Sequence, residues 1–303
     1  MDKDLYEAVK TLIPEERILA DEPMSAHTTF KAGGNADLFI SLKSPEELSG
    51  LLSLFNKTAE KYVVIGNGSN LLVSDKGFRG AVLQIMAGMS RITADGSIIR
   101  AEAGALLSKV SDTALEHGLK GLEFASGIPG TVGGAMVMNA GAYGGEMKDL
   151  VTEVLLMDEK GERFTLSNED MHFGYRHSIL KEKRYVALET VFRLEKGDKE
   201  EIRNKIAEFS KSRRDKQPLD KPSAGSTFKR PEGNFAGKLI MEAGLSGFSV
   251  GGAKVSEKHC GFIINDGNAT AGDIYSLIGE VKKRVYENSG VELEPEVCMI
   301  GEF

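Results

Sequence analysis

Residues 126–145 read Ser-Gly-Ile-Pro-Gly-Thr-Val-Gly-Gly-Ala-Met-Val-Met-Asn-Ala-Gly-Ala-Tyr-Gly-Gly, with seven glycines in twenty positions. Glycine at this density leaves backbone N–H groups without a neighbouring Cβ, so a flat ring or a phosphate can lie directly on the main chain. The apolar side chains of Ile128, Val132 and Met136 are untypical of a flexible linker, and so many glycines are untypical of a core strand. The stretch therefore predicts a backbone cradle for a ligand.

A second glycine-rich loop lies upstream, where the β-branched run Val63-Val64-Ile65 leads directly into Gly66-Asn67-Gly68-Ser69-Asn70. The loop lacks the third glycine and the helix of a Rossmann fingerprint, and no Gly-Lys-Ser/Thr follows as in an ATP-hydrolysing P-loop. Taken alone, it is as consistent with an ordinary glycine turn as with a phosphate cradle. Two cradles in one chain, however, predict a long ligand with a diphosphate and a planar ring, which is a dinucleotide cofactor.

Composition limits the class of protein. The 303 residues include 38 basic and 45 acidic ones, a net charge of −7 that argues against binding to nucleic acid or to a membrane surface. The two cysteines, Cys260 and Cys298, lie far apart in no metal-ligand spacing, so neither a disulfide framework nor structural zinc is expected. The opening residues Met1–Asp4 do not resemble a signal peptide, and no apolar run is long enough to span a bilayer. We expect a soluble protein of a reducing compartment.

Helices and strands are predicted throughout, which gives an α+β class. Ser44-Pro45-Glu46-Glu47 is a helix start, followed by an apolar face at Leu48, Leu51, Leu52 and Phe55. Strand-like runs at 37–42 and 62–66 flank this helix in a β-α-β-like unit. A second helix is predicted over 105–117, closed by Gly118.

After Leu150 the sequence pattern favours strands before it returns to helices. A hairpin is predicted from 150–158 and 162–166, and strands from 185–194 and 291–300. Asp198 opens a helix with Ile202, Ile206 and Phe209 that ends before Pro218. Thr270 opens another with Asp273 three residues on, its inward face formed by Ile274, Leu277, Ile278, Val281 and Val285, and Gly290 lies past its end.

Charged residues in the second half indicate an anionic substrate. Residues 211–230 contain seven Lys or Arg residues against Asp215 and Asp220. The helix dipole explains the basic residues near a helix end, but not Lys229 and Arg230, which follow the small-residue turn Gly225-Ser226. On spacing alone, an arginine such as Arg176 is most simply a surface residue and Glu296 a solvent-facing strand residue.

Together, these pieces resemble, in this order, the family of UDP-N-acetylenolpyruvoylglucosamine reductases, flavoenzymes that complete UDP-N-acetylmuramate in bacterial peptidoglycan synthesis. The interval between Arg176 and Ser226 is too short for the tyrosine-bearing loop of the family's longer form, so the resemblance is to the shorter form. The matching stretches span nearly the whole chain and are His27-Thr28-Thr29-Phe30-Lys31-Ala32-Gly33-Gly34, Gly66-Asn67-Gly68-Ser69-Asn70, Gly127-Ile128-Pro129-Gly130-Thr131-Val132-Gly133-Gly134, Tyr175-Arg176-x-Ser178, Ala224-Gly225-Ser226-x-Phe228-Lys229 and Leu293-Glu294-Pro295-Glu296-Val297.

The resemblance implies a two-part FAD-binding fold of the vanillyl-alcohol-oxidase/PCMH type in residues 1–80 and 81–195. A smaller α+β substrate-binding domain follows in 196–290, with the strand at 291–303 returning to the first part. It implies non-covalent FAD, NADPH as co-substrate and a UDP-sugar substrate, with hydride passing from flavin N5 to C3 of the enolpyruvyl group. We expect a cytoplasmic, monomeric enzyme with no metal site and no nucleic-acid or membrane partner.

The resemblance also assigns roles to single residues. Arg176 and Glu296 match the pair beside the enol carboxylate, and Ser226 matches the proton donor to C2. The residues expected to bind the substrate are Tyr175, Lys216, Lys229 and Arg230. The residues expected to bind FAD are Gly66, Asn67, Gly68, Ser69, Asn70, Leu71, Ser126, Gly127, Ile128, Pro129, Gly130, Thr131, Gly133, Gly134 and Ala135.

Two other functions remain as alternatives. An FAD-dependent alcohol or sugar oxidase of the same superfamily would often carry a covalently tethered flavin, for which His27 is the candidate by position. A non-catalytic FAD-carrying subunit would not need Arg176, Ser226 and Glu296 together, and it would not turn over NADPH alone.

Overall fold

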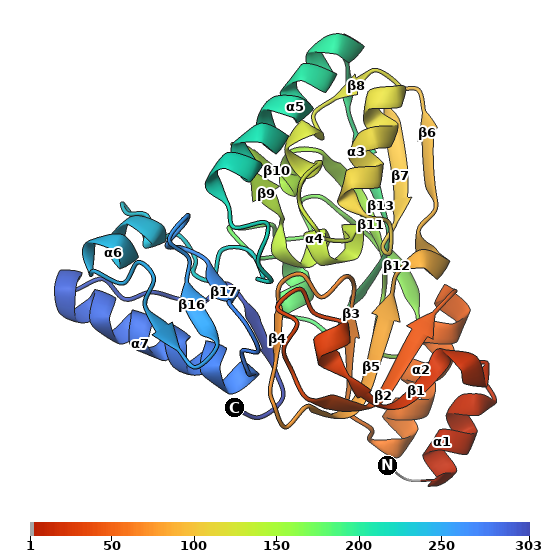
Figure 1. Cartoon of the computed structure of the whole chain (residues 1–303). Coiled ribbons are helices and arrows are strands. Elements are labelled where there is room, and N and C mark those ends of the chain that lie inside the picture. The colour runs from red at the N-terminus through yellow and green to blue at the C-terminus, as the bar shows by residue number, and fades with distance from the viewer. Residues whose placement is uncertain (1–2) are drawn as a thin grey trace. The chain divides into compact units, whose positions relative to one another are not determined.

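The structure, a computed structural model, describes residues 3–303 and divides them into two compact units (Figure 1). Unit 1 holds the chain up to Ala20 together with Leu38–Asn67 and Gly80–Ser212, and unit 2 holds Asp21–Asp37, Gly68–Arg79 and Arg213–Phe303. The predicted three-part division, with boundaries near 80 and 195, is finer and stays a prediction. Met1 and Asp2, part of the opening stretch considered above, lie outside the described residues.

The N-terminal region contains a four-stranded sheet in the order β1-β2-β5-β3. Its strands are Ile18–Pro23, Asn35–Leu42, Phe78–Ile85 and Tyr62–Ile65, and the helices beside them are α1 (Lys3–Lys10) and α2 (Pro45–Thr58). Strand β3 pairs with β5 in parallel, so β5 lies between the two strands of the predicted β-α-β unit. The predicted start of α2 is confirmed, because Ser44 accepts a hydrogen bond from the Glu47 amide and Leu48, Leu51, Leu52 and Phe55 are buried.

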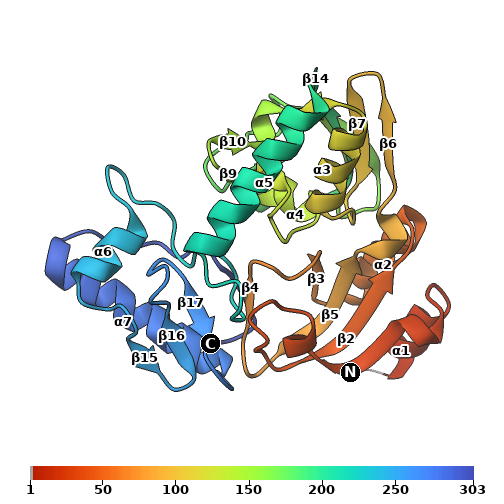
Figure 2. The same cartoon turned by 45° about the horizontal axis from the view of Figure 1, so that its top comes forward.

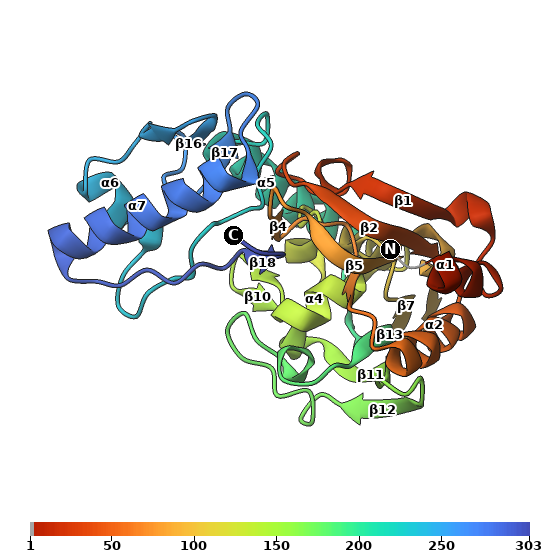
Figure 3. The ribbon, with the colours of Figure 1, turned by 90° about the horizontal axis from the view of Figure 1, so that it is seen from below.

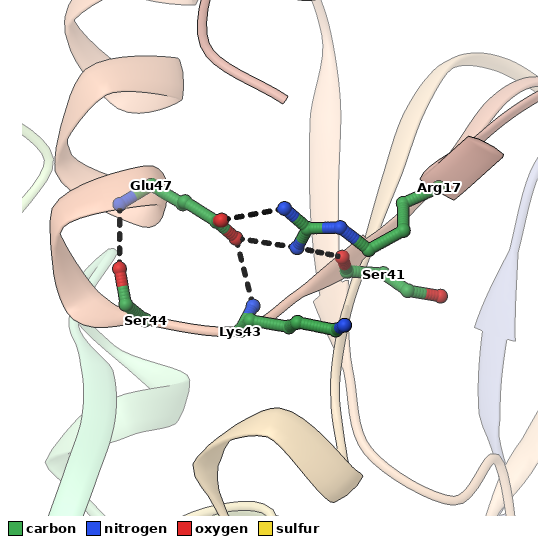
Figure 4. Close-up of polar contacts among 5 residues, drawn as sticks. All are labelled: Arg17, Ser41, Lys43, Ser44 and Glu47. Atoms are coloured by element: carbon green, nitrogen blue, oxygen red, sulfur yellow. Dashed lines mark hydrogen bonds and ion pairs between the residues drawn. The ribbon is translucent and has the colours of Figure 1, made fainter. Parts of the chain in front are cut away.

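A bidentate ion pair ties the start of α2 to the residue before β1 (Figure 4). The two terminal nitrogens of Arg17 lie 2.7 and 2.8 Å from the carboxylate oxygens of Glu47, which also accepts from the Lys43 amide at 2.8 Å. Burial alone would raise the pKa of Glu47, but the hydrogen bonds from Arg17 and Lys43 outweigh it and lower the pKa below 4.5. The pair therefore stabilises the fold in its ionised form.

We expect Arg17→Met to lower the free energy of unfolding by about 1.5–3 kcal/mol at pH 7, the usual value of a hydrogen bond to a charged group. A carboxyl whose pKa is lowered by folding contributes stability above its unfolded pKa and loses it as pH falls through the folded pKa. The difference between wild type and variant should therefore shrink below pH 4.5 in urea unfolding. The exposed pair of Arg163 and Glu46 is the control: Arg163→Met should change stability very little.

The rest of unit 1 centres on a five-stranded antiparallel sheet in the order β12-β11-β13-β7-β6. The strands are Arg163–Ser167, Val151–Met157, Val186–Arg193, Ile98–Glu102 and Ile92–Asp95, so the predicted hairpin and the strand at 185–194 are confirmed. Helices α3 (Leu107–Glu116) and α4 (Val132–Met138) pack against β6, β7 and β13 (Figures 1 and 2).

Short elements complete unit 1. Strand β8 (Leu119–Lys120) pairs with β14 (Glu195–Lys196), and β9 (Gly141–Ala142) pairs with β10 (Gly145–Glu146). Helix α5 (Lys199–Lys216) begins as predicted, with the Asp198 carboxylate accepting from the first amides of the helix, but only Ile202 of its apolar residues is buried. Helix α3 starts two residues later than predicted, because the Ala105 backbone is bonded to Glu102 and Val132.

Unit 2 is a helix-covered sheet of three antiparallel strands, β15 (Ser249–Val250), β16 (Ala253–Val255) and β17 (Ile263–Asn265). Helix α7 (Ala271–Ser289) runs along this sheet, with α6 (Ala236–Glu242) beside it (Figure 3). The predicted capping box of Thr270 and Asp273 is confirmed, as are the left-handed Gly290 and the five inward residues.

The predicted strand over 291–300 is wrong in extent. Only β18 (Cys298–Ile300) is a strand, and it pairs in parallel with β4 (Leu71–Val73). Pro295 has no N–H to donate, so the preceding segment cannot continue a ladder and makes a single antiparallel bridge with Phe228 instead. This bridge joins the segments that carry Ser226 and Glu296, two residues of the candidate site.

Two further findings concern membranes and metals. Among residues 3–303, no helix has both the length and the apolar composition needed to cross a bilayer. Within the same residues, no three His, Cys, Asp or Glu side chains come together to hold a metal ion.

Candidate active site

The two glycine-rich loops contact each other within unit 1. Gly66 directly follows β3, and the side-chain amide of the next residue, Asn67, donates to the Pro129 carbonyl at 2.7 Å. A Cβ built on Gly66 would lie 2.2 Å from Oγ1 of Thr131, so only glycine allows this approach. The chain segments predicted to share one ligand are therefore neighbours in the fold.

The sequence predicted a backbone cradle along the whole glycine-rich stretch 126–145. In the structure only part of this stretch is open backbone. Residues 132–138 form α4, because Thr131 caps the helix and Val132, Ala135 and Met136 are buried against the sheet. The first amides of α4 are already bonded: Val132 donates to Ala105, Gly133 to Ala103, and Gly134 to the Thr131 hydroxyl.

Two of these glycines therefore have different roles. A Cβ on Gly133 would come within 3.0 Å of the Ala103 Cβ, so close helix–sheet packing explains this glycine without a ligand. Gly134 is exposed, and a Cβ there would make only an ordinary contact with Thr131. The start of α4 itself offers no open anion site.

The amides available for a ligand lie just before α4 and in the upstream loop. Among the described residues, the backbone N–H groups of Asn67, Gly130 and Thr131 donate to no protein group. Backbone donors of partly buried residues normally find an acceptor, and anionic phosphate oxygens satisfy such clustered amides well. This part of unit 1 therefore fits a diphosphate.

The second half of the upstream loop belongs to unit 2. Gly68 has a positive φ of 63°, and a Cβ there would lie 1.9 Å from the His27 carbonyl oxygen. The side-chain amide of Asn70 donates to the Glu296 carbonyl at 3.1 Å, and the backbone carbonyl of Asn70 accepts from the Cys298 amide at 2.9 Å. The loop is thereby fixed to the segment that carries Glu296, a connection that the sequence did not predict.

Ser226 and Glu296 lie on adjoining antiparallel segments of unit 2. The Glu296 amide donates to the Thr227 carbonyl and the Lys229 amide to the Glu294 carbonyl, both at 2.8 Å. Thr227 is fully buried, and its hydroxyl accepts from the Ile263 amide at 3.0 Å. Two candidate catalytic side chains, about seventy residues apart in the sequence, are thus held on one rigid support.

Arg176 belongs to unit 1 and sits in a tight turn. The amides of Gly174 and His177 each donate to the other residue's carbonyl, at 3.0 and 3.2 Å, with Tyr175 and Arg176 between them. Arg176 has a positive φ of 54°, which is uncommon for a residue with a long side chain, and strained backbone of this kind clusters at active sites. Its guanidinium lies over the Tyr175 ring, 5.0 Å from the ring centroid.

The basic residues expected to bind the substrate have different surroundings. Lys229 forms an ion pair with Glu294. The Arg230 guanidinium lies 4.0 Å from the centroid of the Phe235 ring. Lys216 is exposed at the last residue of α5. Lys229 is thus paired with a carboxylate, Arg230 is stacked on an aromatic ring, and Lys216 lies at a helix end.

Comparisons with known proteins identify the family. Residues 36–167 match an FAD binding domain, and residues 217–300 match the C-terminal domain of UDP-N-acetylenolpyruvoylglucosamine reductase. The UDP-N-acetylenolpyruvoylglucosamine reductase of Caldanaerobacter subterraneus is 51% identical over 302 residues, covering 100% of both chains, and that of Clostridioides difficile is 48% identical over 99% of both. This chain belongs to the UDP-N-acetylenolpyruvoylglucosamine reductase family.

Comparison with solved structures supports the same family. The crystal structure of UDP-N-acetylenolpyruvylglucosamine reductase from Thermus caldophilus matches with a TM-score of 0.80 and 36% identity, over 94% of this chain and 98% of that one. The grass pollen protein Phl p 4, a glucose dehydrogenase, matches with a TM-score of 0.53 and 14% identity, over 65% of this chain and 45% of that one, which shows a shared fold alone. The predicted fold class, an FAD-binding fold with a smaller α+β part, is confirmed, and FAD is the cofactor.

Proposed function

We propose that the chain reduces the enolpyruvyl group of UDP-N-acetylenolpyruvoylglucosamine to give UDP-N-acetylmuramate, with NADPH as the source of electrons. The pairing of residues 227–229 with 294–296 supports this function above all, because Ser226 and Glu296 then lie on adjoining segments. The identity of the substrate is inferred from membership of the family. We further propose that the enzyme works in the cytoplasm as a monomer.

FAD, held by the amides of Asn67, Gly130 and Thr131, would supply the hydride for C3 of the enolpyruvyl group. Negative charge then builds on C2 and its carboxylate. Arg176 binds that carboxylate through its planar fork and stabilises the growing charge. Glu296 helps only if it carries a proton or is paired with a cation, since a bare carboxylate would repel the substrate.

Ser226 donates its hydroxyl proton to C2. Serine is a weak acid, so the reaction requires the hydroxyl to be held within reach of C2 in a pocket that excludes water. Thr227, buried and bonded on both sides of its backbone, fixes the neighbouring peptide. Lys216 and Arg230 bind the substrate diphosphate, with Tyr175 beside Arg176 at the sugar end.

The purified protein should be yellow, and its flavin band should bleach with NADPH under anaerobic conditions. Adding UDP-N-acetylenolpyruvoylglucosamine should then restore the band with one equivalent of product. Acid precipitation should release the flavin. A flavin that stays with the precipitate, is reduced by an alcohol or sugar, and is reoxidised only by oxygen would instead indicate an oxidase.

A further inference from the structure

Asn139 is a fully buried polar residue whose side chain makes three hydrogen bonds. Its amide nitrogen donates to a Glu146 carboxylate oxygen and to the Gly174 carbonyl, both at 3.0 Å. Its carbonyl oxygen accepts from the Lys148 amide at 2.9 Å. A buried side chain with this many specific bonds fixes the relative positions of the segments it joins.

The backbone of Asn139 explains why this residue type occurs here. The residue ends α4 in the left-handed conformation, with φ 41° and ψ 58°, and its amide donates to the Ala135 carbonyl. Asparagine adopts this conformation more easily than other residues with a side chain, and glycine adopts it freely. Among these two residue types, only asparagine also supplies an amide group.

One of the bonds of Asn139 holds the turn that carries Arg176. The Gly174 carbonyl accepts from both Asn139 and the His177 amide, so Asn139 is attached to the base of the turn. The strained residue Arg176 is two positions further on, and its backbone carbonyl accepts from the Lys181 ammonium at 3.1 Å. Only Tyr175 lies between Gly174 and Arg176, so a shift of the Gly174 carbonyl acts close to the arginine.

The head of Arg176 is held by the same stretch of chain. Its guanidinium donates to the Gly141 carbonyl at 3.4 Å, in the β9–β10 hairpin that begins two residues after Asn139. Glu146, the other partner of the Asn139 amide, ends that hairpin. Residues 139–146 thus contact the arginine turn at its base and the arginine side chain at its tip.

We propose that Asn139 is a positioning residue for Arg176: its amide holds the 174–177 turn so that the guanidinium is presented to the substrate carboxylate. The inference rests on the proposed function, in which Arg176 binds that carboxylate. Misplacement of an oriented group by about 1 Å can cost about 10²-fold in rate, so a backbone anchor at the base of the turn has a measurable effect. Arg176 remains the catalytic residue, and Asn139 acts through it.

The test uses Asn139→Gly in the FAD-loaded enzyme, because glycine adopts the left-handed backbone freely while the side-chain amide is lost. FAD content and NADPH-driven bleaching should match the wild type. Reoxidation by UDP-N-acetylenolpyruvoylglucosamine should slow by about 10–100-fold. Asn168→Ala is the matched control: it removes an asparagine amide that donates to the Lys148 and Val151 carbonyls in the same unit, so it should lower the melting temperature without slowing reoxidation.

A double-mutant cycle separates positioning from general damage. In an Arg176→Ala background, Asn139→Gly should cause no further slowing, because a residue that acts through Arg176 has nothing left to position. Independent, multiplicative losses would overturn the proposal, and so would a normal reoxidation rate for Asn139→Gly beside a slow Arg176→Ala. If Arg176→Ala itself reoxidised normally, the proposed function would fail instead, and the two failures are thereby distinguished.

Asn139→Asp keeps the test decisive if the glycine variant does not fold. The new carboxyl keeps the acceptor for the Lys148 amide but faces the Glu146 carboxylate, with the Lys148 ammonium as the neighbouring cation. Like charges raise the pKa, so the introduced group regains a proton, and with it a donor, as pH falls. Reoxidation relative to wild type should therefore recover toward low pH, and a pH-independent ratio would count against the proposal.

Discussion

Ser226→Ala is expected to separate the two halves of the catalytic cycle. NADPH should bleach the flavin band at close to the wild-type rate, because that step needs no proton donor at C2. Reoxidation by UDP-N-acetylenolpyruvoylglucosamine should slow by about 10²–10⁴-fold, the usual contribution of a positioned general acid. Rapid-mixing spectroscopy at the flavin band measures each half-reaction separately.

The surroundings of Ser226 indicate that this substitution should leave the local backbone undisturbed. Gly225 before it has a φ of 75° and open space around it, and Thr227 after it is anchored to Gly261 and Ile263, so the segment does not depend on the serine side chain. Ser226→Cys should recover part of the lost rate, since a thiol holds a transferable proton in nearly the same place. Ser223→Ala, on the same segment, is the control and should leave both half-reactions unchanged.

Equal slowing of both half-reactions in Ser226→Ala would identify the residue as structural. The proton donor would then have to be sought elsewhere, with Glu296 as the first candidate because its segment adjoins that of Ser226.

Gly66→Ala is expected to yield protein with weakened FAD binding. The added Cβ would lie 2.2 Å from the Thr131 hydroxyl, so either the Gly66–Asn67 loop or the 130–131 segment must move. Overpacking typically costs about 1–3 kcal/mol, which corresponds to roughly 5–150-fold in affinity if the strain falls on the cradle. The ratio of flavin to protein absorbance after gel filtration, and titration of the apoprotein with FAD, measure the loss without any assay of activity.

A second substitution identifies the cause of the loss. Thr131→Ala removes the hydroxyl that the new Cβ would meet, so the Gly66→Ala/Thr131→Ala double variant should regain most of the FAD, apart from about 1 kcal/mol of lost helix capping. Gly279→Ala is the control, because it lies inside α7 with open space around it and should leave FAD binding intact. Full FAD occupancy in Gly66→Ala would refute the placement of the cradle.

Much of the fold could be predicted because its signals are local. The start of α2 at Ser44 and the capping box of Thr270 with Asp273 depend on residues three positions apart, and both are present in the structure. The extent of α4 was not predicted for the opposite reason, because it depends on distant contacts, whereas the short extent of β18 has a local signal, Pro295, that the prediction overlooked. Burial against the five-stranded sheet makes a helix of a glycine-containing segment, and Pro295 shortens a strand whose apolar pattern continues.

The candidate site could likewise be predicted only in part. The residue types and motifs indicated an arginine, a serine and a glutamate acting on an anionic substrate beside a dinucleotide cofactor, but only through resemblance to a family. Which cradle amides remain available could not be predicted, because the partners of Val132 and Gly133 come from residues 103–105. The role of Asn139 was not predicted, since it depends on a hydrogen bond to Gly174, thirty-five residues further along the chain.

By itself, then, the sequence determined the secondary structure around strong caps, the two glycine loops and the family. Only the tertiary structure decided that Gly66 packs on Thr131, that the Ser226 and Glu296 segments pair, and that Asn139 supports the arginine turn. Helix caps and turns depend on interactions between near neighbours in the chain, so a sequence pattern can predict them. A hydrogen bond between residues thirty-five or seventy positions apart exists only once burial has brought them together and excluded the water that would otherwise take its place.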